Sequence, residues 1–415
     1  MGAGRPRGYP ARFYEILGSP PCRERAVDLK AMEKGYFGKH VFLGLLGLLG
    51  VMVALLPCEL WLRIYHPDQY QPYSYLQKHK RYLVNGQESI DNGMFTRSNY
   101  YAFESRHHLN AVITDRYFSF TQKVTTNGDG FRFFGNPNGQ DKIMVLGDSV
   151  TFGVGVDDGE SYPDQLQRLL GRDYQVLNYG VGCWGFAEYY LTYKRYTPQV
   201  CPGLIILGVF PSNDFDDLRA ASWRGKAQGD LPRPPLVRRD VYLDREEQLC
   251  STEWTYRVPG LRNLATFVLL NKVLVRRLTG RVERWADGRN PLATEALSLK
   301  IIADMAREHR VLVLLLPARY NYENRKFLQQ MEHYGEKVQQ IKGVHLIDFF
   351  PLVRARAQEL YVDGSHFNQE GNRLVAQEIY GFLRKNHLLP RSKGSDSMAR
   401  GALPRDRDPA AAARR

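Results

Sequence analysis

Residues 143–153 read IMVLGDSVTFG, an apolar run that leads into Gly147, Asp148 and Ser149. An apolar run that ends in a glycine-containing turn is typical of a strand buried on both faces of a parallel sheet. Such strands end at the edge of the sheet where α/β proteins bind their ligands. Serine is also a common cap of a helix, so Ser149 alone indicates either a reactive hydroxyl or a cap.

Further stretches of the same kind follow along the chain. They are short and apolar, as strands of a parallel sheet are, and they lie at residues 142–146, 175–178, 204–209, 311–316 and 344–349. Amphipathic stretches between them predict helices at residues 161–170, 186–196, 295–309, 326–342 and 369–385. This alternation predicts an α/β fold with a parallel central sheet.

Two loops after the second and third predicted strands contain hydrogen-bond donors. Residues 178–185 read NYGVGCWG, and residues 208–214 read GVFPSND. Because parallel strands end at one edge of the sheet, we expect Gly182 and Asn213 to lie close to Ser149. Backbone N–H groups and an Asn carboxamide are the usual donors of an oxyanion hole. Both residue types are also common in turns, so the pattern alone does not decide.

The segment before the last predicted helix, residues 361–371, reads YVDGSHFNQEG and places Asp363 three residues before His366. An Asp at this spacing can accept a hydrogen bond from one imidazole nitrogen while the other nitrogen faces a serine. The pair is weak evidence by itself. Combined with Ser149, it predicts a catalytic triad of Ser149, His366 and Asp363.

These segments together resemble the SGNH hydrolases, also called the GDSL esterase/lipase family. The family has a Ser in G-D-S, a Gly after the second strand, an Asn in the third segment and a D-x-x-H before the final helix, and all four occur here in order. The resemblance covers about residues 140–388 and implies a flavodoxin-like three-layer α/β/α fold. It assigns catalysis to Ser149, His366 and Asp363 and the oxyanion hole to Gly182 and Asn213, with no cofactor and no metal.

One position departs from the family pattern. Cys183 stands where the glycine of the family's second segment often falls, with Gly182 one residue earlier. A backbone N–H does not depend on the side chain, so either residue can supply the donor, but a cysteine is strained if the position needs a positive φ. Residues 126–132 (TNGDGFR) and 160–163 (ESYP) further resemble membrane-anchored bacterial members of the family.

Residues 41–58 contain no charge, and Trp61 follows at the distance expected of an interfacial aromatic. Their length is near the lower limit for a membrane span, and a buried helix of a soluble protein is the alternative. We predict a transmembrane anchor at 41–62. Residues 21–40 carry more Lys and Arg than residues 59–78, which predicts a cytoplasmic tail at 1–40. The chain is then a single-pass protein of the plasma (inner) membrane with a periplasmic catalytic domain.

The remaining composition limits the other classes of function. The net charge is +13, but much of the excess lies in 1–40 and 391–415, which argues against nucleic-acid binding. Five scattered cysteines without a C-x-x-C pair do not suggest a zinc site. Asp214, Asp216 and Asp217 are interpreted as the solvated start of a loop.

The sequence also predicts the organisation of the chain. A small β-containing lead-in occupies 66–140, and the hydrolase domain occupies 141–388, with an insertion at about 214–291 that includes a helix at 261–278. A disordered tail is predicted at 391–415.

The functional prediction is a serine-dependent ester hydrolase that acts through an acyl-enzyme. Its expected substrate is an acylated small molecule or glycan, such as an acetyl ester of an envelope glycan. Two alternatives remain open. One is an O-acyltransferase that modifies an exported polysaccharide, and the other is a catalytically silent carbohydrate-binding module with the same fold.

Overall fold

The computed structural model describes residues 29–65, 81–89, 92–132, 139–224, 230–238, 241–243, 249–251, 266 and 291–390. The chain comprises two compact units, residues 1–61 and 62–415. Helix α1 (Leu29–Tyr65) accounts for the described part of the first unit. Among the described residues, no helix combines the length and apolarity needed to cross a membrane, so the predicted anchor at 41–62 is not confirmed. The tail predicted at 391–415 and most of the one at 1–40 lie outside these ranges.

A five-stranded parallel sheet forms the centre of the second unit, with the strand order β15-β14-β9-β7-β8. The strands are β7 (Asp141–Gly147), β8 (Tyr174–Gly180), β9 (Leu204–Val209), β14 (Val311–Leu315) and β15 (Val344–Asp348). In chain order this is the 2-1-3-4-5 arrangement of flavodoxin-like folds, whose ligand site lies at the switch point between the first and third strands. The predicted parallel α/β sheet is confirmed, and each predicted strand lies within two residues of an observed one.

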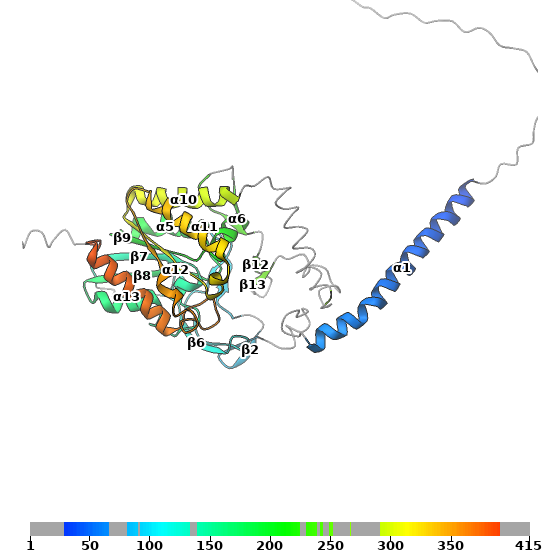
Figure 1. The fold of residues 1–415 in the computed structure, drawn as a ribbon, viewed down its shortest axis with the longest axis horizontal. Coiled ribbons are helices and arrows are strands. Elements are labelled where there is room, and N and C mark those ends of the chain that lie inside the picture. Colours follow the sequence, from blue (N-terminus) through cyan, green and yellow to red (C-terminus); the bar gives the residue numbers. More distant parts are fainter. Residues whose placement is uncertain are drawn as a thin grey trace, which may run out of the picture. The chain divides into compact units, whose positions relative to one another are not determined.

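Helices cover both faces of this sheet (Figure 1). One face carries α5 (Phe186–Val200), α6 (Asp214–Ala220), α10 (Pro291–Glu308) and α11 (Arg325–Gln339), and the other carries α4 (Tyr162–Leu170), α12 (Phe349–Arg354) and α13 (Gln369–Lys385). Alternate side chains of β7 enter opposite cores. Met144 and Leu146 belong to the cluster under α5 and α10, while Ile143 and Val145 belong to the cluster under α4 and α13. Burial on both faces is the reason that the strand reads as an uninterrupted apolar run.

Smaller antiparallel sheets precede and interrupt the α/β framework. Before it, β1 (Tyr82–Val84), β2 (Gln87–Ser89), β5 (Asn110–Asp115) and β6 (Phe120–Thr125) form a sheet of order β2-β1-β5-β6, and β3 (Phe95–Thr96) pairs with β4 (Glu104–Ser105). After α6, β10 (Ala221–Trp223) pairs with β11 (Leu236–Arg238), and β12 (Val241–Leu243) pairs with β13 (Leu249–Ser251). The helix predicted at 261–278 lies outside the described residues except for Thr266.

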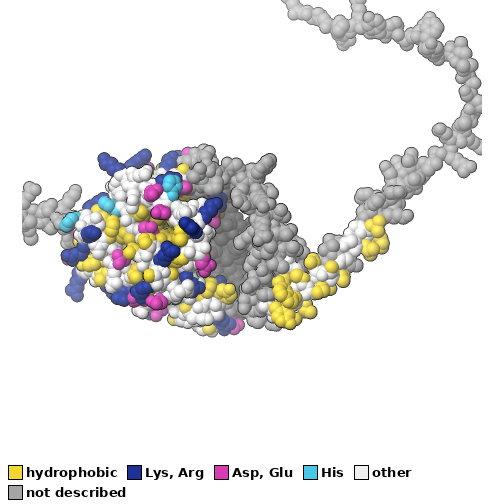
Figure 2. Space-filling view, in the orientation of Figure 1, with side chains coloured by type: hydrophobic (Ala, Val, Ile, Leu, Met, Phe, Trp, Pro, Cys, Tyr) yellow, Lys and Arg dark blue, Asp and Glu magenta, His cyan; other side chains and the backbone are white. Residues whose placement is uncertain are grey.

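Charged side chains of both signs are mixed on the face of the second unit that Figure 2 shows. Basic residues there are interspersed with acidic ones and with apolar surface. The positive net charge is therefore not gathered into a basic stripe on this face.

Candidate active site

Ser149 is the first residue of a short helix, α3 (Ser149–Phe152), that starts directly after β7. The Asp148 side chain caps this helix, because its Oδ1 accepts a hydrogen bond from the Val150 backbone N–H at 2.9 Å. The strand and the helix meet so closely that a Cβ on Gly147 would overlap the Thr151 side chain. This tight turn places the Ser149 hydroxyl, which is half-buried, at the carboxyl edge of the sheet.

The structure brings Ser149, His366 and Asp363 together. The His366 Nε2 atom lies 2.9 Å from Ser149 Oγ, and its Nδ1 atom lies 2.6 Å from Asp363 Oδ2. The other oxygen of Asp363 accepts hydrogen bonds from the backbone N–H groups of Ser365 and His366 at 2.9 and 2.8 Å. The carboxylate is therefore fixed by its own loop, and it in turn orients the imidazole toward the serine.

Electrostatics keep Asp363 in its charged form. Burial raises the pKa of Asp363, but hydrogen bonds and the charge of His366 outweigh burial, so that the pKa of this carboxyl is held below its ordinary value. Its side chain is only 3% exposed, whereas that of His366 is 19% exposed. The anionic partner is thus shielded from solvent more completely than the imidazole.

Gly182 lies beside the proposed nucleophile. A Cβ built on Gly182 would lie 3.8 Å from the Ser149 Cβ, and the residue is buried. No hydrogen bond from its backbone N–H is found among the residues that the structure describes. Buried backbone N–H groups almost always have a hydrogen-bond partner. We therefore expect the partner of the Gly182 N–H to be a substrate oxygen that binds next to Ser149.

Cys183, rather than Gly182, has the left-handed backbone conformation, with a φ of 62°. The strain expected for a cysteine in this loop is therefore present, but it falls on the residue after the proposed donor. A backbone N–H is present whatever the sign of φ, so Gly182 stays the predicted donor with Cys183 as the alternative. The Cys183 carbonyl accepts a hydrogen bond from Arg238 at 2.9 Å.

Replacement of Cys183 by glycine is expected to raise the free energy of unfolding by about 1 kcal/mol, because glycine adopts positive φ without the Cβ clash. The rate of any Ser149-dependent reaction is expected to stay unchanged, since the backbone N–H remains. Urea denaturation and serine-labelling rates measure the two effects. Cys201→Gly is the matched control, because Cys201 has a φ of 51° at the exposed end of α5 and lies outside the site. A rate loss specific to Cys183→Gly would show that the Cys183 side chain takes part in the reaction.

Asn213 lies at the N-terminus of α6, at the same sheet edge. Its Nδ2 atom donates to Asp217 Oδ2 at 3.1 Å. Burial raises the pKa of Asp148 to about 6, although hydrogen bonds from the Val150 N–H and the Asn213 side chain lower it. Asn213 thus lies against the residue that precedes Ser149. A carboxylate only accepts hydrogen bonds, so these contacts fix Nδ2 rather than Oδ1 toward the acids.

Several residues that shape the site were not identified from the sequence. The three acids after Asn213 were interpreted as solvated, but Asp214 is fully buried and Asp217 nearly so. Asp214 accepts hydrogen bonds from the Tyr189 hydroxyl and the Phe210 N–H, both at 2.9 Å. The interpretation of these two residues was wrong, because the short helix α6 turns them inward. Their i, i+3 spacing is the signal that was available.

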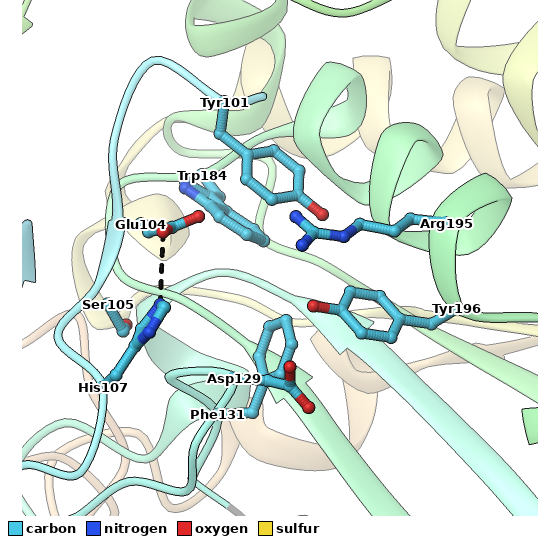
Figure 3. Close-up of a pocket in the computed structure, with 9 residues that line it drawn as sticks. All are labelled: Tyr101, Glu104, Ser105, His107, Asp129, Phe131, Trp184, Arg195 and Tyr196. Carbon is cyan, nitrogen blue, oxygen red and sulfur yellow. Dashed lines mark hydrogen bonds and ion pairs between the residues drawn. The ribbon is translucent and has the colours of Figure 1, made fainter. Parts of the chain in front are cut away.

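A separate pocket lies beside the small β3–β4 sheet (Figure 3). Its lining includes Tyr101, Trp184, Arg195 and Tyr196, together with Glu104 and His107, which are paired at 3.2 Å. Its volume is about 30 Å³, which is room for one or two water molecules. No member of the Ser149–His366–Asp363 triad lines it, so it is distinct from the candidate active site.

No protein-family model and no curated protein sequence matches the chain. The chain is similar to the crystal structure of TesA at 16% identity, with a TM-score of 0.36 over 59% of this chain and 99% of that one. It is similar to a catalytic mutant of Axe2, an acetylxylan esterase from Geobacillus stearothermophilus, at 13% identity, with a TM-score of 0.34 over 60% of this chain and 95% of that one. A member of the lipolytic G-D-S-L family from Veillonella parvula shows 14% identity and a TM-score of 0.32 over 57% and 94%. The reactivity of Ser149 is inferred from the geometry of its site and not from these similarities.

Proposed function

We propose that this protein is a serine-dependent ester hydrolase of the SGNH type that acts through an acyl-enzyme. The observation that supports the proposal most directly is the continuous hydrogen-bonded series from Asp363 through His366 to Ser149 Oγ. A serine hydroxyl at neutral pH is a weak nucleophile and becomes reactive when an adjacent base takes its proton. An imidazole oriented by a carboxylate is such a base.

In the proposed mechanism His366 Nε2 takes the Ser149 proton as Oγ attacks the ester carbonyl carbon. The C=O electron pair moves to the carbonyl oxygen, which becomes an oxyanion. It receives hydrogen bonds from the backbone N–H groups of Ser149 and Gly182 and from Asn213 Nδ2, which gives up its hydrogen bond to Asp148 for the oxyanion and keeps the one to Asp217. When the intermediate collapses, the bond to the alcohol oxygen breaks and His366 gives its proton to that oxygen.

The second half of the reaction repeats these steps with water. His366 takes a proton from a water molecule, the water oxygen attacks the acyl carbon, and Ser149 Oγ leaves with the proton that His366 returns. Asp363 stays anionic throughout and stabilises the imidazolium that forms twice in each cycle. The low pKa of its carboxyl suits this role.

The proposed substrate is an acylated small molecule or glycan, and the proposed location is the periplasmic side of the inner membrane. The location rests on the uncharged run at 41–58 and the asymmetry of charge around it. Extraction of membranes at high pH tests the anchor: the full-length protein is expected to stay with the lipid. Release into the soluble fraction would contradict the anchor and leave the chemistry untouched.

Labelling of the purified full-length protein with a fluorophosphonate probe tests the reaction class, together with release of p-nitrophenol from p-nitrophenyl acetate. Both signals are expected in the wild type and are expected to be lost in Ser149→Ala. Ser119→Ala is the matched control, because Ser119 is an exposed serine in the turn between β5 and β6, outside the site. Absence of labelling in the folded wild type would contradict the proposal and favour a silent carbohydrate-binding module. Turnover in water without an added acceptor distinguishes a hydrolase from an O-acyltransferase.

A further inference from the structure

Arg238 belongs to β11, within the segment that interrupts the α/β framework after α6, and its side chain is 1% exposed. Its Nη2 atom lies 2.5 Å from Asp217 Oδ1, and its Nη1 atom lies 3.4 Å from Glu188 Oε1. Nη1 also donates to the Cys183 carbonyl at 2.9 Å. One guanidinium therefore joins three separate parts of the chain: the loop after β8, helix α5 and helix α6.

Two of these partners are directly next to a proposed oxyanion donor, and the third fixes the end of the loop that contains Gly182. Asp217 accepts the hydrogen bond from Asn213 Nδ2, and its second oxygen is the one that Arg238 contacts. The Cys183 carbonyl belongs to the residue that follows Gly182 in the chain. Glu188 accepts a hydrogen bond from the Gly185 N–H at 3.1 Å and so closes the other end of the same loop.

Arg238 brings a positive charge to a region that is rich in buried acids. Asp148, Glu188, Asp214 and Asp217 are all buried on this side of the sheet, and Arg238 contacts two of them. A buried charge without a partner is expensive, and the usual outcome is that the group takes up a proton. Burial already raises the pKa of Glu188 against the opposing effect of Arg238. Without the guanidinium, Asp217 would lose the contact at its Oδ1 atom and would hold Asn213 less firmly.

We propose that Arg238 is a positioning residue of the active site, which holds Asn213 and the Gly182–Cys183 loop in the geometry that an oxyanion hole requires. The inference rests on the proposed function, since it concerns the same site. The segment inserted after α6, to which Arg238 belongs, then contributes to the rate of the reaction.

Steady-state kinetics of Arg238→Met, Arg238→Lys and Arg219→Met test the proposal on p-nitrophenyl acetate with the full-length protein. We expect Arg238→Met to lower kcat by about 10- to 100-fold while KM changes by less than about 3-fold, because transition-state contacts are lost and substrate contacts are not. Arg238→Lys is expected to recover part of kcat, because an ammonium reaches one carboxylate but does not form the forked contact. Arg219 lies on α6 in an exposed pair with Asp216 at 2.7 Å, and its replacement is expected to leave kcat unchanged.

A double-variant cycle with Asn213→Ala separates positioning from a general structural effect. If Arg238 acts through Asn213, Arg238→Met is expected to cost much less in the Asn213→Ala background than in the wild type. Losses that multiply in full would overturn the inference. Should Arg238→Met not fold, Asp217→Asn carries the same test, because the amide keeps the shape but removes the charge that Arg238 and Asn213 share.

The outcomes distinguish this inference from the proposed function. Wild-type kcat in Arg238→Met, together with inactivity of Ser149→Ala, would overturn the role of Arg238 and leave the hydrolase intact. Absence of Ser149-dependent labelling in the wild type would overturn the hydrolase, and the positioning role with it. A specific kcat loss that is smaller in the Asn213→Ala background would support both.

Discussion

Replacement of His366 by alanine is expected to lower kcat for ester hydrolysis by about 10⁴-fold or more, as much as Ser149→Ala does. The reason is that His366 Nε2, 2.9 Å from Ser149 Oγ, is the better placed of the two acceptors that the hydroxyl has among the described residues, since Asp148 Oδ2 lies 3.4 Å away. Without His366, attack depends on the very small fraction of serine that is ionised. Stopped assays with p-nitrophenyl acetate over long incubations measure the residual rate.

The double variant Ser149→Ala, His366→Ala gives the sharper result. Residues that act as one unit show losses that do not multiply, so the double variant is expected to be no slower than either single one. His333→Ala is the matched control, because His333 is exposed on α11 and pairs with Glu336 at 3.3 Å. Substantial turnover in His366→Ala, or losses that multiply in the double variant, would contradict a base that acts on Ser149.

The second large effect concerns stability. Replacement of Arg132 by methionine is expected to lower the free energy of unfolding by about 3–5 kcal/mol. The Arg132 side chain is fully buried and donates to the carbonyls of Gly153 and Val156, both at 2.7 Å, and to that of Lys123 at 3.0 Å. It also pairs with Asp158 at 3.2 Å. Methionine fills similar space but leaves these buried acceptors without donors, and this loss sets the size of the effect.

Urea denaturation of the full-length protein measures this change. Arg116→Met is the control, since Arg116 is exposed and pairs with Glu88 at 2.9 Å, and its loss is expected to change stability by less than about 0.5 kcal/mol. A loss below about 1 kcal/mol in Arg132→Met would show that water satisfies the carbonyls. The segment from Gly153 to Val156 follows α3 directly, so labelling of Ser149 is also expected to slow in this variant.

The central sheet was predictable because its strands are buried on both faces and therefore carry a continuous apolar signal. The long helices were predictable because their apolar residues repeat with the helical period over several turns. Helix α13 begins and ends at the residues that this periodicity predicts. Helices α6 and α12 were missed, because six or seven residues span too few turns to establish a period. Both start after an Asn or Asp residue, Asn213 and Asp348, and these residue types are equally common in turns.

The triad was recognisable because each member lies on a short segment with its own local pattern. The residues behind it were not, because their contacts join distant parts of the chain. Arg238 contacts Cys183 and Asp217 across 55 and 21 residues. Arg132 contacts carbonyl groups, which no sequence pattern displays. The local sequence indicates which segments can form a site. The residues that position those segments, such as Arg238 and Arg132, are identified only from the tertiary structure.

The Ser149–His366 contact spans 217 residues of chain, and a second link between the same regions, from the Tyr162 N–H to Asn372 Oδ1, spans 210. During synthesis the serine emerges early, and its base emerges only after every strand of the central sheet has been made. Pairing so distant in sequence also carries a large loop-closure entropy, which is compensated only when the intervening layers pack. Under the proposed mechanism a nascent or partly folded chain carries an inert hydroxyl, and reactivity is expected only of the finished protein.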